Sequence, residues 1–153
     1  MKKNMIVYMM GLVLLIIDQI VKSIVNKTIP IGHIRPGIEG IISITNLRNT
    51  GAAWSILEGS QWFFYIVSII AISVIVYLLF RMRSSLGFTI GFVLMLAGTI
   101  GNFIDRIRLH YVVDMFQLDL FSFPIFNVAD MCLTFGVIVI FGMIIFEDRL
   151  DGK

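Results

Sequence analysis

The sequence predicts an all-α integral membrane protein of four transmembrane helices with a small extracytoplasmic β-rich loop region. Hydrophobic residues make up 58% of its 153 residues and charged residues only 14%, and the mean hydropathy is +0.95. A soluble domain this small buries too little of its surface to hide so much apolar area. Several uncharged segments also approach the roughly 20 residues that a helix needs to cross a bilayer. We therefore expect a single membrane domain, 1–153.

The first predicted helix covers residues 5–25, a largely apolar segment that contains Asp18, Gln19 and Lys22. Basic residues followed by an apolar run also resemble a secretory signal peptide. No small-x-small cleavage site follows, however, and the acidic Asp18 lies where cleavage would be expected. We therefore interpret this segment as a membrane helix.

Three further helices are predicted at 62–80, 86–104 and 128–146, because these segments contain long apolar runs. Only the last includes a charged residue, Asp130, close to its start. Four spans place both termini on one side of the membrane. Basic residues are denser in the short stretches on that side than in the longer loops opposite, which favours cytoplasmic termini.

The two long connecting segments, 26–61 and 105–127, are the predicted outer loops. Pro and Gly residues punctuate the first of them. Residues 42–45 then alternate between apolar and polar, and 52–57 could form a second short strand. A small sheet at the outer membrane surface is the expected result.

Polar residues gather near the outer ends of the predicted helices, whereas the cytoplasmic halves contain no charge. Polar side chains at membrane depth are costly and usually face a bundle interior or a wet cavity. We therefore expect one shallow site that opens toward the outside. Its candidate residues are Asp18, Lys22, Asn49, Asn102, Asp105, Arg106, Asp114, Asn127 and Asp130.

Several candidates also have structural explanations. Asp18 and Lys22 have the i, i+4 spacing of a helix ion pair, and Arg106 could mark the end of a helix. Asn127 and Asp130 have the spacing of a capping box, in which the helix dipole favours an ionised acid. None of these explanations accounts for Asp114.

Other site chemistries find little support in the sequence. The two histidines have no metal-ligand spacing, and the single cysteine excludes a Cys-based metal site or an intramolecular disulfide. The net charge of +2 gives no sign of nucleic-acid binding. Neither a metal nor a cofactor is expected.

Asp114 and Asp130 suggest acid–base hydrolysis. Two carboxyl groups brought together at a low-dielectric boundary cannot both ionise cheaply, so one stays protonated. The ionised member can take a proton from a water while the protonated member polarises a scissile carbonyl. The helix-start position suggests Asp130 as the more acidic member of a coupled pair.

Five short motifs occur in order along the chain: DQIVK at 18–22, NTGAAW at 49–54, GTIGNFIDR at 98–106, VVD at 112–114 and FNVAD at 126–130. With these motifs on four spans, the chain resembles the lipoprotein signal peptidases (signal peptidase II), which are bacterial membrane aspartyl peptidases. The match covers nearly the whole chain. Ala97 and Met115 depart from the usual pattern, but neither is a proposed catalytic group.

The resemblance implies removal of the signal peptide from a diacylglyceryl-modified prolipoprotein, just before the lipidated cysteine and without a cofactor. It implies that Asp114 and Asp130 are the catalytic pair. The residues implied to bind substrate or support the site are Asn49, Gly51, Asn102, Arg106, Asn127, Asp18 and Lys22.

The resemblance also implies a setting and partners. A multi-pass protein of the bacterial cell membrane is expected, working as a monomer, with its site at the outer face. Its partners would be membrane lipid, the lipidated substrate and cyclic-peptide inhibitors of the globomycin type.

Two other functional classes stay open at this point. A small transporter or proton-coupled exporter would use intramembrane acids as a proton relay, but it predicts a charge near mid-membrane. A non-enzymatic scaffold subunit predicts that amide replacements of Asp114 and Asp130 leave function intact.

Overall fold

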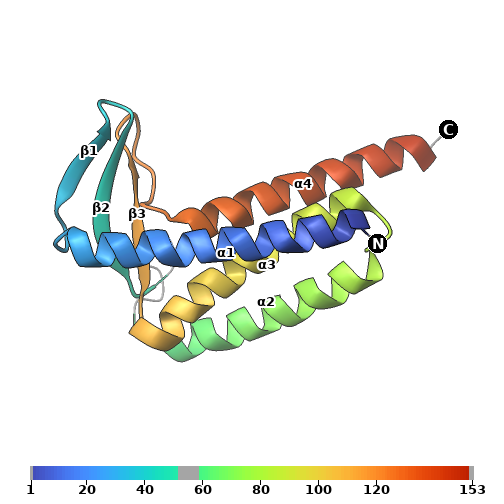
Figure 1. The fold of residues 1–153 in the computed structure, drawn as a ribbon, viewed down its shortest axis with the longest axis horizontal. Helices are drawn as coiled ribbons and strands as arrows, with labels where there is room; N and C mark the ends of the chain where they lie inside the picture. Colours follow the sequence, from blue (N-terminus) through green and yellow to red (C-terminus); the bar gives the residue numbers. More distant parts are fainter. Residues whose placement is uncertain (1, 52–58, 152–153) are drawn as a thin grey trace.

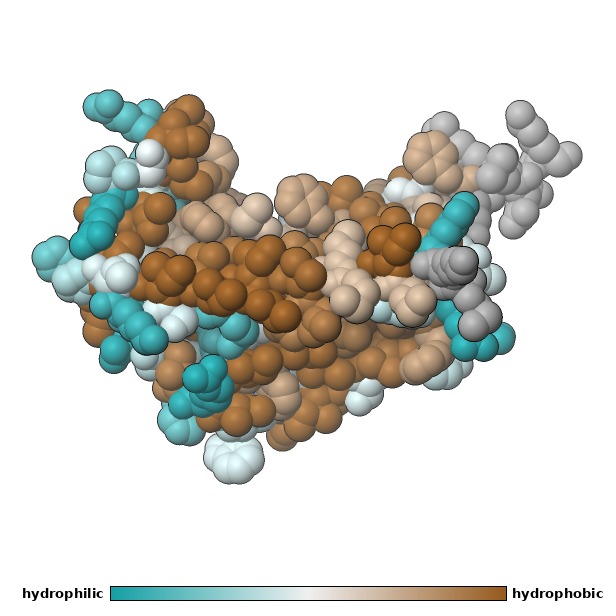
Figure 2. Space-filling view, in the orientation of Figure 1, coloured by the Kyte–Doolittle hydropathy of each residue, from teal (hydrophilic) through white to brown (hydrophobic). Residues whose placement is uncertain are grey.

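A computed structural model describes residues 2–51 and 59–151, and within these residues it has four long helices and one three-stranded sheet (Figure 1). The helices are α1 (Lys2–Thr28), α2 (Gln61–Arg81), α3 (Leu86–Leu109) and α4 (Val128–Asp151). All four are long and apolar enough to cross a membrane, as predicted. Their outward side chains form a largely continuous apolar band, with hydrophilic residues mainly at the two ends (Figure 2).

Helix α3 is the centre of the bundle because it packs against each of the other three helices. Half of its most apolar window is buried, against 17% for each of the others. Glycines allow α4 to approach it closely. A Cβ atom on Gly98 would collide with the carbonyl oxygen of Ala129, and one on Gly136 would lie 2.8 Å from the carbonyl oxygen of Gly91.

The sheet consists of β1 (Ile34–Ile38), β2 (Ile42–Asn49) and β3 (Val112–Leu118) in the order β1-β2-β3. Both pairings are antiparallel. The sheet lies at one end of the bundle, and both chain termini lie at the other (Figure 1).

A second small core joins this sheet to the helices. Val25 and Ile29, at the end of α1, are buried with Val113 and Met115 of β3. The sheet is therefore fixed to the bundle, and β3 is held over the ends of α1 and α3.

The structure corrects the predicted loops in two places. Helix α3 continues past the predicted end at residue 104 to Leu109, because an apolar window measures the hydrocarbon span and not the end of the helix. The predicted second outer loop, 105–127, contains β3. The polar Asp114 interrupts the apolar pattern of this strand, which hid it in the sequence.

Strand β1 also contains Pro36 and Gly37, which the sequence analysis treated as loop punctuation. Proline is tolerated there because β1 is an edge strand, and the register shifts between Pro36 and Ile38. The possible strand at 52–57 lies outside the described residues.

Replacing Gly98 with Ala should lower the free energy of unfolding by about 1–3 kcal/mol, because the added methyl group forces α3 and α4 apart. Thermal unfolding in detergent micelles measures the change. Gly142→Ala is the matched control: a Cβ there has no neighbour within 4 Å, so stability should stay equal or rise slightly. Equal losses in both variants would contradict the close-packing explanation.

Candidate active site

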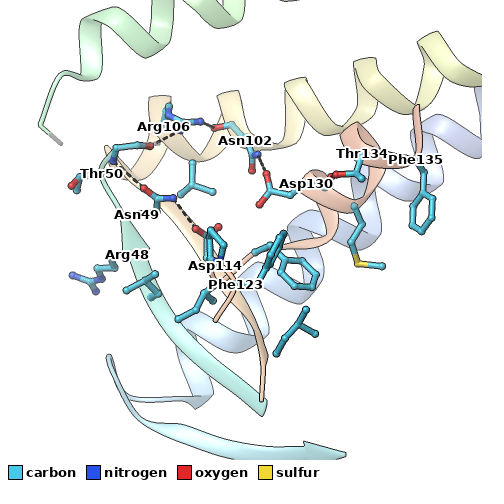
Figure 3. Close-up of a pocket in the computed structure, with 18 residues that line it drawn as sticks. Arg48, Asn49, Thr50, Asn102, Arg106, Asp114, Phe123, Asp130, Thr134 and Phe135 are labelled. Carbon is cyan, nitrogen blue, oxygen red and sulfur yellow. Dashed lines mark hydrogen bonds between the residues drawn. The ribbon is translucent and has the colours of Figure 1, made fainter. Parts of the chain in front are cut away.

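A cavity of about 890 Å³ lies where the sheet meets the C-terminal end of α3 and the first turns of α4. Its polar wall includes Asn49, Gly51, Asn102, Arg106, Asp114 and Asp130. Its apolar wall includes Phe123, Pro124, Ile125, Phe126, Met131 and Phe135. Figure 3 shows that the labelled polar residues come from β2 and the residue that follows it, and from β3, α3 and α4.

Asp114 is carried by β3, and its side chain is buried. Two asparagines donate to its carboxyl group. Asn49 Nδ2, at the end of β2, lies 2.9 Å from Oδ2. Asn127 Nδ2 lies 2.6 Å from Oδ1. The sheet pairing explains the first contact, because β2 and β3 run side by side here, with Leu47 opposite Asp114.

Asp130 lies in the first turn of α4. The predicted capping box is present: the backbone N–H of Asn127 donates to Asp130 Oδ2 at 3.1 Å, and that of Asp130 donates to Asn127 Oδ1 at 2.9 Å. Asn102 Nδ2 of α3 donates to Asp130 Oδ1 at 2.8 Å (Figure 3).

Each of the four carboxyl oxygens of Asp114 and Asp130 therefore accepts one N–H hydrogen bond. Asn127 is the common partner, since its side chain contacts Asp114 and its backbone contacts Asp130. Amide donors orient a carboxyl group but do not supply a titratable proton. A proton used for chemistry at this end of the cavity must come from the carboxyl groups or from a bound molecule.

Burial, and after it the nearby charge of Asp130, raise the pKa of Asp114 to about 7, although hydrogen bonds from Asn49 and Asn127 oppose the shift. The physical cause is the cost of placing a charge where water is largely excluded. Asp114 is therefore protonated over most of the range below neutral pH.

Arg106 lies beside the pair on the same cavity wall. Its Nη2 donates to the carbonyl oxygen of Gly51 at 3.2 Å, and its guanidinium lies 4.7 Å from the centre of the Phe64 ring. Tyr65 donates to the carbonyl oxygen of Arg106 at 3.0 Å. Arg106 is thus a charged member of the wall and not simply the end of a helix.

Asp18 and Lys22 lie behind the cavity and do not line it. They form the predicted i, i+4 ion pair, with 3.0 Å between Lys22 Nζ and Asp18 Oδ2. Lys22 makes a second ion pair of 3.1 Å with Asp105. All three charged side chains are buried.

The structure brings most of the predicted site residues to one cavity. Asn127 does not line this cavity but contacts both Asp114 and Asp130, which do. The sequence analysis missed two features. The apolar wall gave no signal beyond the cluster of aromatic residues at 121–126. Asp105 was noted as a candidate but not selected, although an acid in an apolar helix was a usable signal.

No group of three or more His, Cys, Asp or Glu side chains that could hold a metal ion is found in the described ranges 2–51 and 59–151.

Comparison with known proteins gives one consistent result. A family model described as signal peptidase (SPase) II matches residues 10–146. A lipoprotein signal peptidase of Lactiplantibacillus plantarum is 53% identical over 138 residues, which cover 90% of this chain and 93% of the relative. One from Enterococcus faecalis is 47% identical over 157 residues, which cover 100% of this chain and 98% of the relative.

A solved structure of a bacterial membrane enzyme has the same fold. It superimposes with a TM-score of 0.88 at 35% identity, covering 100% of this chain and 93% of that chain.

The raised pKa of Asp114 makes stability depend on pH. A carboxyl group with a higher pKa in the folded protein than in the unfolded chain stabilises the fold below the unfolded value of about 4 and loses this contribution as pH rises toward 7. The free energy of unfolding in detergent should fall by a few kcal/mol between about pH 4 and pH 7, since each pKa unit corresponds to about 1.4 kcal/mol. Asp114→Asn should flatten the curve, and an unchanged slope would contradict the assignment.

Proposed function

The chain belongs to the signal peptidase II family, and we propose that it removes signal peptides from prolipoproteins by using Asp114 and Asp130 to activate one water molecule. The observation that carries this proposal is the shared partner of the two carboxyl groups. Asn127 contacts both, and both line the same cavity. Aspartic peptidases need two carboxyl groups that share one proton, and this arrangement supports such a pair.

The hydrogen bonds and the helix start support different roles for the two residues. Asp130 occupies the first turn of α4, where the dipole favours a negative charge. Asp114 has its pKa raised to about 7 by burial and by the charge of Asp130, which favours the protonated form. We therefore assign the resting proton to Asp114 and the charge to Asp130.

The reaction follows from these roles. The oxygen of the water attacks the scissile carbonyl carbon while Asp130 accepts a proton from this water. At the same time Asp114 gives its proton to the carbonyl oxygen. Asp130 then protonates the peptide nitrogen, the carbon–nitrogen bond breaks, and a hydroxyl proton of the intermediate returns to Asp114. The products are a carboxylic acid and a free amine, and both aspartates regain their starting states.

The two walls of the cavity suit a substrate that stays in the membrane. Met131 and Phe135 line it from α4, and both are among the exposed apolar side chains of that helix. Phe123 faces the same space from the loop after β3 (Figure 3). An apolar signal peptide and its acyl chains can thus contact this wall while the scissile bond reaches the polar one. Such remote contacts can orient the reacting bond.

The proposal includes further expectations about the cleavage position, inhibition, oligomeric state and orientation. Cleavage occurs just before the lipidated cysteine, and a cyclic peptide of the globomycin type competes for the cavity. The chain works as a monomer in the bacterial cell membrane. Both termini face the cytoplasm, and the sheet and cavity face outward.

Replacing either Asp114 or Asp130 with Asn should reduce cleavage of a lipidated preprotein by at least about 10³-fold, because acid–base catalysis needs a titrating group at each position. A gel-shift assay with purified protein measures the rate. Asp119→Asn is the matched control, since this exposed carboxylate does not line the cavity and bonds to Ser43. Turnover by either of the first two variants at near wild-type rates would refute the pair.

Treatment with EDTA should leave the cleavage rate unchanged, because the proposed reaction uses only the two carboxyl groups and water. The same gel-shift assay, with and without added divalent cations, provides the measurement. A metal requirement would show that the reaction has been misassigned.

A further inference from the structure

The backbone on either side of the cavity is tied to buried acids. Asp18 of α1 accepts a hydrogen bond at 2.9 Å from the backbone N–H of Ala129. Ala129 directly precedes Asp130 and has one of the first N–H groups of α4, which lack a partner within the helix. The carboxylate of Asp18 thus fixes the backbone at the start of α4, directly before Asp130.

The second aspartate is held in a similar way. Asp105 of α3 accepts a hydrogen bond at 3.3 Å from the backbone N–H of Val113. Val113 directly precedes Asp114 on β3. Two buried acids from different helices therefore hold the residues just before the two site aspartates.

Lys22 connects the two acids. Its Nζ lies 3.0 Å from Asp18 Oδ2, 3.1 Å from Asp105 Oδ2 and 2.8 Å from Asn102 Oδ1. An ammonium group has three N–H donors, and these three acceptors match them in number. Since Lys22 is only 3% exposed, water competes little for these contacts.

The contact with Asn102 determines which way this amide points. An ammonium group can only donate, so the atom of Asn102 that faces Lys22 must be the oxygen. The amide NH₂ group then faces Asp130, where it donates to Oδ1 at 2.8 Å. Asn127 Nδ2 donates to the same Asn102 oxygen at 3.2 Å and supports this orientation.

The charge of Lys22 also acts on the aspartate pair. Lys22 interacts electrostatically with both Asp114 and Asp130. Asp18 of α1, Arg106 of α3 and Asp114 of β3 also act on Asp130. A buried cation favours an ionised carboxylate nearby.

We propose that Lys22 is a positioning residue for the reaction: it joins the buried anchors of Asp114 and Asp130 and fixes the Asn102 amide toward Asp130. This inference rests on the proposed function. It assigns to Lys22 a role in the geometry and charge of the pair, without contact with the substrate.

The test compares Lys22→Met with Gln19→Met. Gln19 donates to the same two acids, Asp18 and Asp105, but makes no hydrogen bond to Asn102. Lys22→Met should lower kcat by about 10- to 100-fold, since each 1.4 kcal/mol of lost transition-state stabilisation is about tenfold. KM should change less than about threefold, because the cavity wall that binds substrate is intact.

The pH dependence of kcat provides a second measurement, because a loss of stability alone would not shift its acidic limb. Without the cation, a higher pH is needed to ionise the pair, so the acidic limb of the kcat profile should shift upward by about one pH unit. Gln19→Met should leave the limb in place and lower kcat less than Lys22→Met does, because Gln19 carries no charge and does not hold the Asn102 amide. Equal kcat losses in the two variants, with unshifted limbs, would overturn the proposal.

Lys22→Met leaves two buried carboxylates without their cation and can prevent folding. The double variant Lys22→Met with Asp105→Asn removes one charge of each sign and is measured in parallel. It should fold and, compared with Asp105→Asn alone, show the same kcat loss and limb shift. If neither variant can be purified folded, Lys22 is required for the fold alone and the proposal is wrong.

The outcome is separable from that of the proposed function. Cleavage by the wild-type protein and its loss in Asp114→Asn test the function, whatever Lys22 does. A wild-type protein that cleaves the lipidated preprotein while Lys22→Met retains full kcat would overturn only the role of Lys22.

Discussion

A carboxyl group near the hydrocarbon boundary is tolerated only when each of its oxygens has a partner, and this constraint organises the end of the molecule that carries the sheet. Asp114 and Asp130 receive their hydrogen bonds from asparagines of β2, α3 and the segment before α4. Meeting this requirement brings four separate elements to one point. The hydrogen bonds that offset the free-energy cost of burying these acids also fix their positions relative to the cavity.

Much of this arrangement could be predicted from the sequence. The four spans followed from uncharged apolar runs, because a bilayer admits only backbone whose polar groups are satisfied within the helix. The ion pair of Asp18 and Lys22 and the capping box of Asn127 and Asp130 followed from spacing alone. Such local contacts depend on one element only, and the helical period places them.

Contacts between elements were harder to predict. Strand β3 was missed because its pairing with β2 depends on residues far away in the sequence. The hydrogen bond from the Val113 N–H to Asp105 was missed for a similar reason. It forms only because α3 extends beyond its apolar window and β3 passes close to the end of α3. The apolar wall of the cavity combines α4 with the loop at 123–126, and neither segment indicates the other.

Asp130 belongs to the first turn of a helix that also spans the membrane. A transmembrane helix adjusts to lipid of a different thickness by tilting or by deforming the bilayer around it. The height of this carboxyl group relative to the phospholipid headgroups is therefore set by the apolar length of α4 and the local lipid composition. Thin and thick bilayers would present the cavity at different levels, so lipid chain length becomes a physical variable that controls which bond of a membrane-inserted chain lies within its reach.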